Sequence, residues 1–380
     1  MNSMRHDAIP MSRPDINEND VDLVVSALRS GVLSIGRFVE QFENLARDYI
    51  GTRHAVAVSN GTCGLHLCMR LAGVREGSEV ITSPFSFVAS ANCILYERGT
   101  PVFVDIDEET LNIDPAAVDA AITSRTVGIL PIHVFGRPAA MDRLCEIADQ
   151  RSLVLIEDAC EALGAVYRNR KVGNFGRASV FSFYPNKQMT TGEGAIVATD
   201  DPTWDAGLRS LRNHGRATMG GWLSHDQVGF NYRLNEMSAA LGVSQLSRLD
   251  DLLERRRAVA AKYDEILSAV PGIRTLTPVE GTTSISWFVY VVRLDALLDR
   301  DAVAARLASK GISTRNYFPP IHLQPYFREQ FGFRPGQFPV TERVSASTLA
   351  LPFHTNLSER EIGQVCRALS ESIDETVQRR

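Results

Sequence analysis

A single lysine stands in a position suited to nucleophilic chemistry. Lys187 lies in a loop between two apolar runs, residues 179–183 and 195–198, which are typical of buried strands. Turn-forming residues flank it at positions 185–186 and 192–194. A lysine that is shielded from water has a lowered pKa and can form a Schiff base with an aldehyde. This stretch by itself leaves open the alternative of a solvated loop lysine.

An acidic residue ends another apolar run. Asp158 follows residues 153–156, at the carboxyl end of a predicted strand. Open α/β sheets bind ligands at that end of their strands. A carboxylate there can hold a proton on a pyridine nitrogen and so make the ring an electron sink. The alternative is an aspartate that caps the next helix.

Two further features follow strands at the same predicted edge of the sheet. Gly61 and Thr62 come between the apolar run 54–58 and a helical pattern. The free N–H groups and the dipole of such a helix form a seat for phosphate, although the same pair also suits a plain tight turn. The aromatic pair Phe85 and Phe87 follows the apolar run 80–82. An aromatic side chain there can stack on a flat ring or pack in the core.

These features together match the needs of one cofactor. An anion seat, a ring slot, an acid and an amine all fall at strand ends, in that order along the chain. Pyridoxal 5'-phosphate requires a site for its phosphate, a partner for its ring nitrogen and an amine for its aldehyde. The combination therefore predicts a pyridoxal phosphate enzyme.

The elements that hold these residues form an alternating pattern of strands and helices. Helical patterns separate all the predicted strands but the last two, which implies a largely parallel sheet covered on both faces. The last two strands are joined only by the lysine loop, so we expect them to break the parallel order. The seven predicted strands are residues 54–58, 80–82, 102–104, 127–132, 153–156, 179–183 and 195–198.

The remaining patterns divide the chain into two domains. We predict a large domain over residues 1–270 and a smaller α+β domain over residues 271–380, with the change at Pro271-Gly272. The expected helices of the large domain cover residues 18–30, 38–49, 63–72, 235–249 and 251–270. The expected elements of the small domain are strands at 287–292 and 312–316, a helix at 300–309, and a final helix from Ser358, whose pairing with Glu361 is a capping box.

Composition limits the classes of partner. The chain has 380 residues, of which 44% are hydrophobic, and a net charge of -5. That charge argues against nucleic acid or an anionic membrane as a general partner. No apolar run approaches the ~18 residues of a membrane span. The six cysteines lack metal-type spacing, which favours reduced thiols in a cytoplasmic protein without a metal site.

Six motifs in combination resemble a known family. They are Ser-Asn-Gly-Thr at 59–62, Phe-Ser-Phe-Val-Ala-Ser-Ala-Asn at 85–92, Ile-Glu-Asp-Ala-Cys-Glu-Ala at 156–162, the lysine loop at 182–194, Asn-Tyr-Arg at 231–233 and His-Leu-Gln-Pro at 322–325. From about residue 12 through the final helix the chain resembles the DegT/DnrJ/EryC1/StrS family of sugar aminotransferases. The resemblance implies the type I pyridoxal phosphate aminotransferase fold. That fold is α/β, with a mixed, mostly parallel seven-stranded sheet covered by helices and a smaller C-terminal α+β domain.

The resemblance also implies roles for residues around the cofactor. Lys187 holds pyridoxal phosphate as a Schiff base and then moves the proton, while Asp158 pairs with the ring nitrogen. Phe87 stacks on the ring. The residues implied to hold the phosphate are Gly61, Thr62 and Ser182.

Further roles concern the neighbouring subunit and the substrate. Asn231 resembles the residue that reaches the phosphate of the neighbouring subunit, which implies a homodimer with active sites at the interface. Tyr317 and His322 resemble part of the substrate wall. One position departs from the family pattern, because Glu161 stands where a glutamine is usual, near the cofactor's ring oxygen. Two anionic oxygens there repel each other unless Glu161 is protonated or turned away.

The implied reaction moves an amino group from L-glutamate to a nucleotide-linked keto-deoxysugar. We expect the segment 212–229 to meet the acceptor, with Trp222 offering an apolar face and Arg212 and Arg216 meeting a diphosphate. Two alternatives remain within pyridoxal phosphate chemistry: an enzyme that forms amino-cyclitols or aromatic amines, and a sugar dehydratase. The related dehydratases carry histidine in place of Lys187. A third alternative, an inert regulatory relative, is expected to have lost Lys187 or Asp158.

Overall fold

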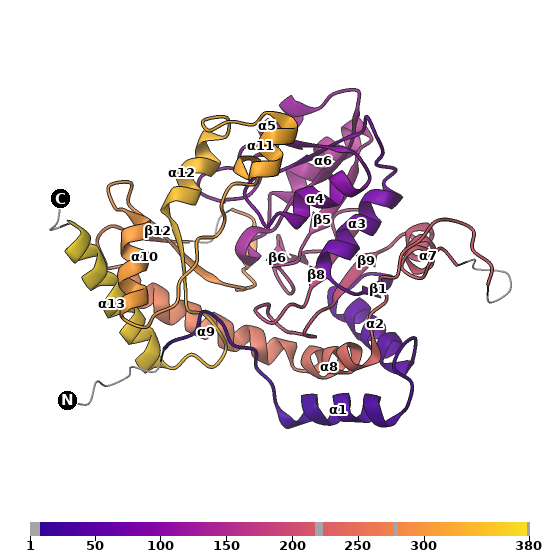
Figure 1. Ribbon diagram of the computed structural model, residues 1–380, viewed down its shortest axis with the longest axis horizontal. Helices are drawn as coiled ribbons and strands as arrows, with labels where there is room; N and C mark the ends of the chain where they lie inside the picture. The colour runs from indigo at the N-terminus through magenta and orange to yellow at the C-terminus, as the bar shows by residue number, and fades with distance from the viewer. Residues whose placement is uncertain (1–7, 217–222, 277–279, 378–380) are drawn as a thin grey trace.

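A seven-stranded sheet forms the centre of the protein. The computed structural model describes residues 8–216, 223–276 and 280–377. The strand order is β1-β9-β8-β5-β4-β2-β3 (Figure 1). Its strands are β1 (His54–Val58), β2 (Glu79–Thr82), β3 (Thr100–Phe103), β4 (Thr126–Leu130), β5 (Val154–Asp158), β8 (Ala178–Ser182) and β9 (Ala195–Thr199). Only β9 runs against its neighbours, β1 and β8, because the lysine loop returns the chain directly beside the strand it left. The prediction of a mixed, mostly parallel seven-stranded sheet is confirmed.

Helices cover both faces of this sheet. In β8, Val180 packs with α3, α4 and α7 on one face, while the next residue, Phe181, packs with α2 and α8 on the other. This alternation follows from the two-residue period of a strand, and full burial explains why these strands are apolar throughout. The helices of this part are α1 (Glu18–Arg29), α2 (Arg37–Ile50), α3 (Gly61–Leu71), α4 (Ala89–Tyr96), α5 (Pro115–Ala121), α6 (Met141–Arg151), α7 (Pro202–Leu211), α8 (Glu236–Ser247) and α9 (Leu249–Leu267).

A second core lies around a small antiparallel sheet, in the order β10-β12-β13. The helix α9 connects the two cores: Leu252 packs in the large one, and Tyr263 and Leu267 in the small one (Figure 1). Ile9, near the start of the chain, also packs in the small core. The division at residue 270 stays a prediction. The elements of this part are β10 (Ile273–Thr275), β12 (Tyr290–Leu294), α10 (Arg300–Ser309), α11 (Pro325–Phe331), α12 (Pro339–Ser347), β13 (Thr348–Leu351) and α13 (Glu359–Val377).

Some predicted elements differ from the structure. The strand predicted at 312–316 is wrong: Ile312 pairs only with Ile9, and Arg315 only with Ala350. Because these two contacts go to different partners, no continuous ladder forms. Three further features were not predicted from the sequence. They are α11, α12 and a small sheet formed by β11 (Thr282–Ser284), β6 (Val166–Tyr167) and β7 (Arg170–Lys171). Within the described ranges, no helix has the length and apolar character needed to cross a membrane.

Candidate active site

Most of the predicted site residues meet at one cavity. It has a volume of about 820 Å³ and opens at the carboxyl ends of β1, β5 and β8. Eight of the ten residues predicted for the site line it, namely Gly61, Thr62, Phe87, Asp158, Glu161, Ser182, Lys187 and Tyr317. Parallel strands bring their carboxyl ends to one edge of a sheet, which explains why residues far apart in the sequence converge there.

Lys187 is shielded from water. Its loop leaves β8 and turns back where the Lys187 N–H donates to the carbonyl of Tyr184, at 2.9 Å. The side chain is 13% exposed, and Nζ lies 3.6 Å from Oε1 of Glu161. The same nitrogen lies 4.0 Å from the centre of the Phe288 ring. The alternative of a solvated loop lysine therefore does not apply.

Asp158 is the last residue of β5 and is 4% exposed. Its Oδ2 accepts a hydrogen bond from the hydroxyl of Ser90 at 2.7 Å, and Oδ1 accepts one from the Cys160 N–H at 3.2 Å. The chain turns after Asp158 without forming a helix, so the helix-cap alternative is wrong. Sequence reasoning missed Ser90, although it lies within the aromatic motif that follows β2.

The seat predicted for phosphate is the start of α3. Asn60 caps this helix by accepting a hydrogen bond from the Cys63 N–H at 2.9 Å. Gly61 faces Ser182 so closely that a Cβ at Gly61 would lie 3.1 Å from the Cβ of Ser182 and 3.0 Å from Sγ of Cys160. Only glycine leaves this seat open, and the helix N-terminus favours an anion in it. The residues present therefore fit the phosphate of pyridoxal phosphate.

The two phenylalanines after β2 have separate positions. Phe85 is fully buried and packs edge-on against Phe135 and Phe318. Phe87 is 62% exposed and lines the cavity. Both readings of this aromatic pair thus apply, one to each residue: Phe85 packs in the core, and Phe87 is available to a ring.

Glu161 is fixed by a neighbouring loop. Its Oε2 accepts a hydrogen bond from the N–H of Phe135 at 2.9 Å, and Phe135 has a left-handed backbone with φ of 57°. A bulky residue rarely adopts that conformation. Burial raises the pKa of the Glu161 carboxyl above its ordinary value, although Lys187 opposes this effect.

Three expected contacts to the substrate, from His322, Arg212 and Trp222, are not found among the described residues. His322 does not line the cavity; it is fully buried, and its Nε2 lies 3.1 Å from Oε1 of Glu342. Arg212 is not free to meet a diphosphate, because it is paired with Glu43 and donates to the carbonyl of Ala57 at 2.6 Å. The expected contact from Trp222 lies outside the described residues.

Asn231 lies outside the cavity of its own chain. It is exposed, and its backbone pairs with that of Asn213 in an isolated antiparallel bridge. The cavity also has lining residues to which the sequence analysis gave no individual role, and six of these are Tyr96, Tyr184, Asn186, Glu193, Tyr232 and Phe288. Most of them are aromatic, a type of residue that a sequence alone assigns to the core.

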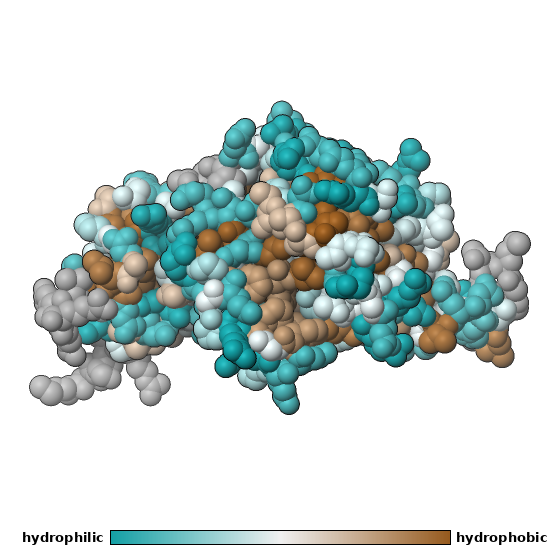
Figure 2. Space-filling model, turned by 90° about the horizontal axis from the view of Figure 1, so that it is seen from above, coloured by the Kyte–Doolittle hydropathy of each residue, from teal (hydrophilic) through white to brown (hydrophobic). Residues whose placement is uncertain are grey.

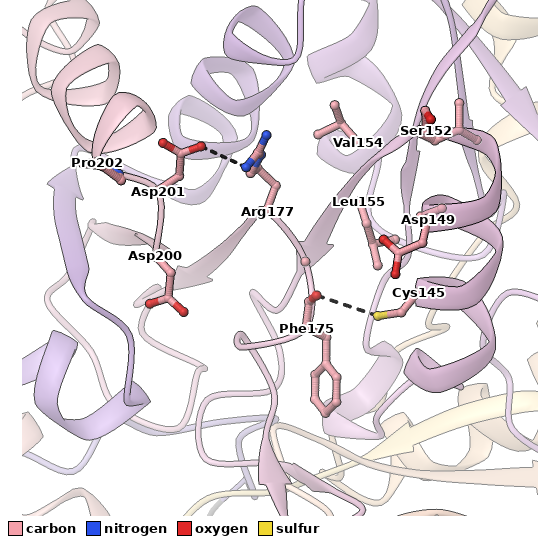
Figure 3. Close-up of a pocket in the computed structure, with 13 residues that line it drawn as sticks. Cys145, Asp149, Ser152, Val154, Leu155, Phe175, Arg177, Asp200, Asp201 and Pro202 are labelled. Carbon is pink, nitrogen blue, oxygen red and sulfur yellow. Dashed lines mark hydrogen bonds and ion pairs between the residues drawn. The ribbon is translucent and has the colours of Figure 1, made fainter.

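A second hollow, of about 830 Å³, lies at the opposite edge of the sheet, at the start of β5 (Figure 3). Several of its polar groups are engaged in structural contacts. Arg177 pairs with Asp201 at 3.0 Å, and Asp200 accepts a hydrogen bond from the backbone of Arg53. Burial raises the pKa of the Cys145 thiol to about 11, so this thiol stays protonated at neutral pH. The arrangement offers no activated nucleophile among the residues drawn.

Comparison with known proteins agrees with this geometry. The model of the DegT/DnrJ/EryC1/StrS aminotransferase family matches residues 14–370. The chain belongs to this family. It is therefore an aminotransferase that uses pyridoxal phosphate, with a lysine and an acid of the family motifs in one cavity.

Individual members of the family are similar over nearly their whole length. The GDP-perosamine synthase of Caulobacter vibrioides is 37% identical over 367 residues, which cover 96% of this chain and 98% of that protein. The structure of S. venezuelae DesV in complex with a ketimine intermediate matches with a TM-score of 0.90 and 34% identity, over 96% of this chain and 98% of DesV. The PLP form of Spr1654 from Streptococcus pneumoniae has a TM-score of 0.92 and 26% identity, over 97% and 99% of the two chains.

Proposed function

We propose that this aminotransferase transfers an amino group from L-glutamate to a keto-deoxysugar carried on a nucleotide. The observation that carries the proposal is the single cavity in which Lys187, Asp158 and the start of α3 converge. The name of the similar GDP-perosamine synthase supports the nucleotide-linked acceptor, because that name describes a GDP-linked product.

Different residues of the cavity would hold different parts of the cofactor. Gly61, Thr62 and Ser182 would hold the phosphate at the start of α3, where N–H groups favour an anion. Phe87 would lie against the ring. When bound, pyridoxal phosphate supplies an aldehyde for amines and a ring that takes up electrons. Asp158 would keep a proton on the ring nitrogen, and Ser90 would keep the Asp158 carboxylate turned toward it.

Lys187 would serve as the proton carrier. Its Nζ is nearly enclosed, between the Glu161 carboxyl and the face of Phe288. A base in this position accepts a proton from one carbon of the bound molecules and returns it to another, while the enclosed cavity limits loss of that proton to water. Glu161 would face the ring oxygen, where its protonated form can donate a hydrogen bond as glutamine does; burial raises the pKa of this carboxyl.

The donor and acceptor would use the same cavity in turn. Tyr317 and Tyr184 line it and offer hydroxyl groups for the sugar or for the carboxylates of glutamate. Burial raises the pKa of the Tyr317 phenol, so it stays protonated and can donate a hydrogen bond at neutral pH.

The proposed active unit is a homodimer. Asn231 is exposed and is proposed to reach the phosphate site of the neighbouring subunit. Six apolar side chains in α1 and just before and after it are at least 46% exposed. They are Ile16, Val21, Leu28, Val32, Leu33 and Ile35. Figure 2 shows a different face, the one opposite α1, where apolar side chains also reach the surface among hydrophilic ones. Exposed apolar side chains that gather on neighbouring segments, as along α1, are typical of an interface between proteins.

Sedimentation tests the dimer. We expect the cofactor-loaded protein to sediment as a dimer, and Asn231→Ala to bind cofactor more weakly while remaining dimeric. Asn235→Ala is the matched control, because Asn235 is also exposed but caps α8. A monomer with full activity and bound cofactor contradicts the proposal.

One assay tests the substrate class. The purified enzyme is given L-glutamate and either a nucleotide-linked 4-keto or 3-keto deoxysugar or the same sugar without nucleotide, at equal concentration. We expect a much higher kcat/KM for the nucleotide-linked form. Equal kcat/KM values would favour an amino-cyclitol or a related free acceptor instead. Bleaching of the yellow cofactor by glutamate alone checks the donor half separately.

A further inference from the structure

Arg256 of α9 is a buried cation without a carboxylate in contact. It is 3% exposed, and no ion pair joins it to any described acid. Burial lowers the pKa of its guanidinium to about 10, so it remains charged at neutral pH. A buried charge is costly unless hydrogen bonds compensate for it. The groups that accept hydrogen bonds from Arg256 therefore have to offset the cost of burying its charge.

Those acceptors are backbone carbonyls on both sides of the cavity. Nη2 of Arg256 donates to the carbonyl of Lys187 at 2.6 Å. Nη1 donates to the carbonyls of Trp287 and Phe288, at 3.4 and 3.3 Å. The fork of one guanidinium thus connects the lysine loop with the segment that leads into β12, and α9 itself packs in both cores.

The two connected segments meet again inside the cavity. Nζ of Lys187 lies 4.0 Å from the centre of the Phe288 ring, so Arg256 holds the backbones of the two residues whose side chains form this contact. The next residue is held as well, since Nε2 of Gln188 donates to the carbonyls of Glu161 at 2.6 Å and Ser286 at 3.0 Å. The hydrogen bonds of Gln188 restrain the loop after the lysine. Among the hydrogen bonds of the described residues, only the one from Arg256 reaches the carbonyl of Lys187 itself.

We propose that Arg256 is a positioning residue for Lys187: its guanidinium clamps the carbonyls of Lys187 and Phe288 and thereby fixes where the lysine amine sits in the cavity. The proposal rests on the lysine chemistry of the proposed function. A cation suits this position better than a neutral donor because hydrogen bonds from charged groups to carbonyls are shorter and stronger. Lysine has no planar fork and reaches only one of the two sets of carbonyls.

The test compares two variants with a matched control. Arg256→Met keeps much of the length and removes the donors, and Arg256→Lys keeps the charge. Arg300 is the control, because its side chain is only 10% exposed and Nη1 donates to the carbonyls of Ser345 and Thr348, outside the cavity. Arg300→Met therefore reports the cost of losing a similar clamp elsewhere in the fold.

Three measurements separate positioning from general stability. The first is kcat and KM for the amino transfer. The second is the visible absorbance maximum of the cofactor-loaded protein. The third needs no turnover: apoprotein is mixed with pyridoxal phosphate and cyanoborohydride, which reduces a Schiff base but spares the free aldehyde. The rate of labelling at Lys187 is followed by peptide mapping, with Lys171, Lys262 and Lys310 as internal references.

For Arg256→Met we expect kcat to fall about 100-fold, the loss that a misplacement of roughly 1 Å causes, with KM changed far less. We also expect slower labelling of Lys187 alone and a shifted absorbance maximum. Arg256→Lys should regain part of kcat. Arg300→Met should lower the unfolding temperature but leave kcat and labelling unchanged.

Two results would overturn the proposal. One is a folded Arg256→Met variant with wild-type labelling of Lys187. The other is a loss of kcat in Arg256→Met and Arg300→Met alike, in proportion to the fraction of folded protein. If Arg256→Met does not fold, labelling and kcat of Arg256→Lys decide, and wild-type values there reject the proposal. If no nucleotide-linked sugar is a substrate, the labelling rates still test Arg256, so the two proposals fail separately.

Discussion

Oε1 of Glu161 lies 3.6 Å from Nζ of Lys187 at the base of the cavity. Both side chains are shielded from water, and the other carboxyl oxygen of Glu161 accepts a hydrogen bond from the Phe135 N–H. The lysine thus has a carboxyl neighbour where the family usually has an uncharged amide. This relationship makes the charge of Glu161 a property that pH can alter.

Glu161→Gln should change how stability depends on pH. Burial raises the folded pKa of Glu161 above its ordinary 4.5, so the folded state binds more protons than the unfolded one above that pH. The free energy of unfolding therefore falls as pH rises from about 4.5 through the folded pKa. Glutamine removes this penalty. We expect the apoprotein of Glu161→Gln to gain unfolding temperature relative to wild type, increasingly so as pH rises from about 4.5 through the folded pKa of Glu161.

Thermal denaturation across that pH range checks the prediction. Glu193→Gln is a suitable control, because Glu193 lines the same cavity but is exposed. A difference between Glu161→Gln and wild type that stays constant with pH would contradict the proposed titration of Glu161.

Lys187→Ala should abolish turnover. The variant lacks the amine that attaches the cofactor and the base that moves the proton, so activity should fall to background. Borohydride treatment of the loaded protein should no longer label the peptide that contains residue 187. Lys310→Ala, on the surface and paired with Glu371, should keep both activity and labelling. More than a trace of transamination by Lys187→Ala would reject the assignment.

Asp158→Asn should separate binding from chemistry. A neutral amide does not keep the ring nitrogen protonated, so kcat should fall by orders of magnitude while cofactor still binds at the α3 seat. Ser90→Ala removes only the hydrogen bond at 2.7 Å to Asp158. We expect a loss in kcat of about tenfold for it, which corresponds to a hydrogen bond with a charged group. Unchanged kcat in Asp158→Asn would leave Asp158 with a structural role only.

Gly61→Ala should weaken cofactor binding. The added Cβ would lie 3.0 Å from Sγ of Cys160 and 3.1 Å from Cβ of Ser182, closer than ordinary contacts, and would occupy the seat itself. We expect the dissociation constant for pyridoxal phosphate to rise by about tenfold or more, as for the loss of one hydrogen bond to a charged group. Equilibrium dialysis measures this constant. Gly363→Ala in α13 is the control: a Cβ there meets only Arg367, at 3.4 Å, so cofactor binding should stay unchanged. If Gly61→Ala binds pyridoxal phosphate as tightly as wild type, the phosphate does not bind at the start of α3.

The sequence determined the central sheet and the edge at which the chemistry lies. Strands buried on both faces are apolar throughout, and the residues that follow them at the carboxyl edge differ in type from the strands themselves, as Asp158 and Gly61 do. The order of these residues along the chain was enough to predict pyridoxal phosphate. The resemblance then selected Phe87 from the aromatic pair and supplied Ser182 and Glu161, all of which line the cavity.

Only the tertiary structure decided which contacts hold the lysine. Arg256 reads in the sequence as one more charge on a long helix, yet its position along α9, between the two cores, buries it against the carbonyls of Lys187 and Phe288. His322 and Arg212 look in the sequence like groups available to a substrate, whereas each is paired with a carboxylate from another element: Glu342 lies 20 residues from His322, and Glu43 lies 169 residues from Arg212. Local patterns determine strands and turns because those depend on near neighbours. The partners of a long polar side chain depend on how separate elements pack, which no local pattern contains.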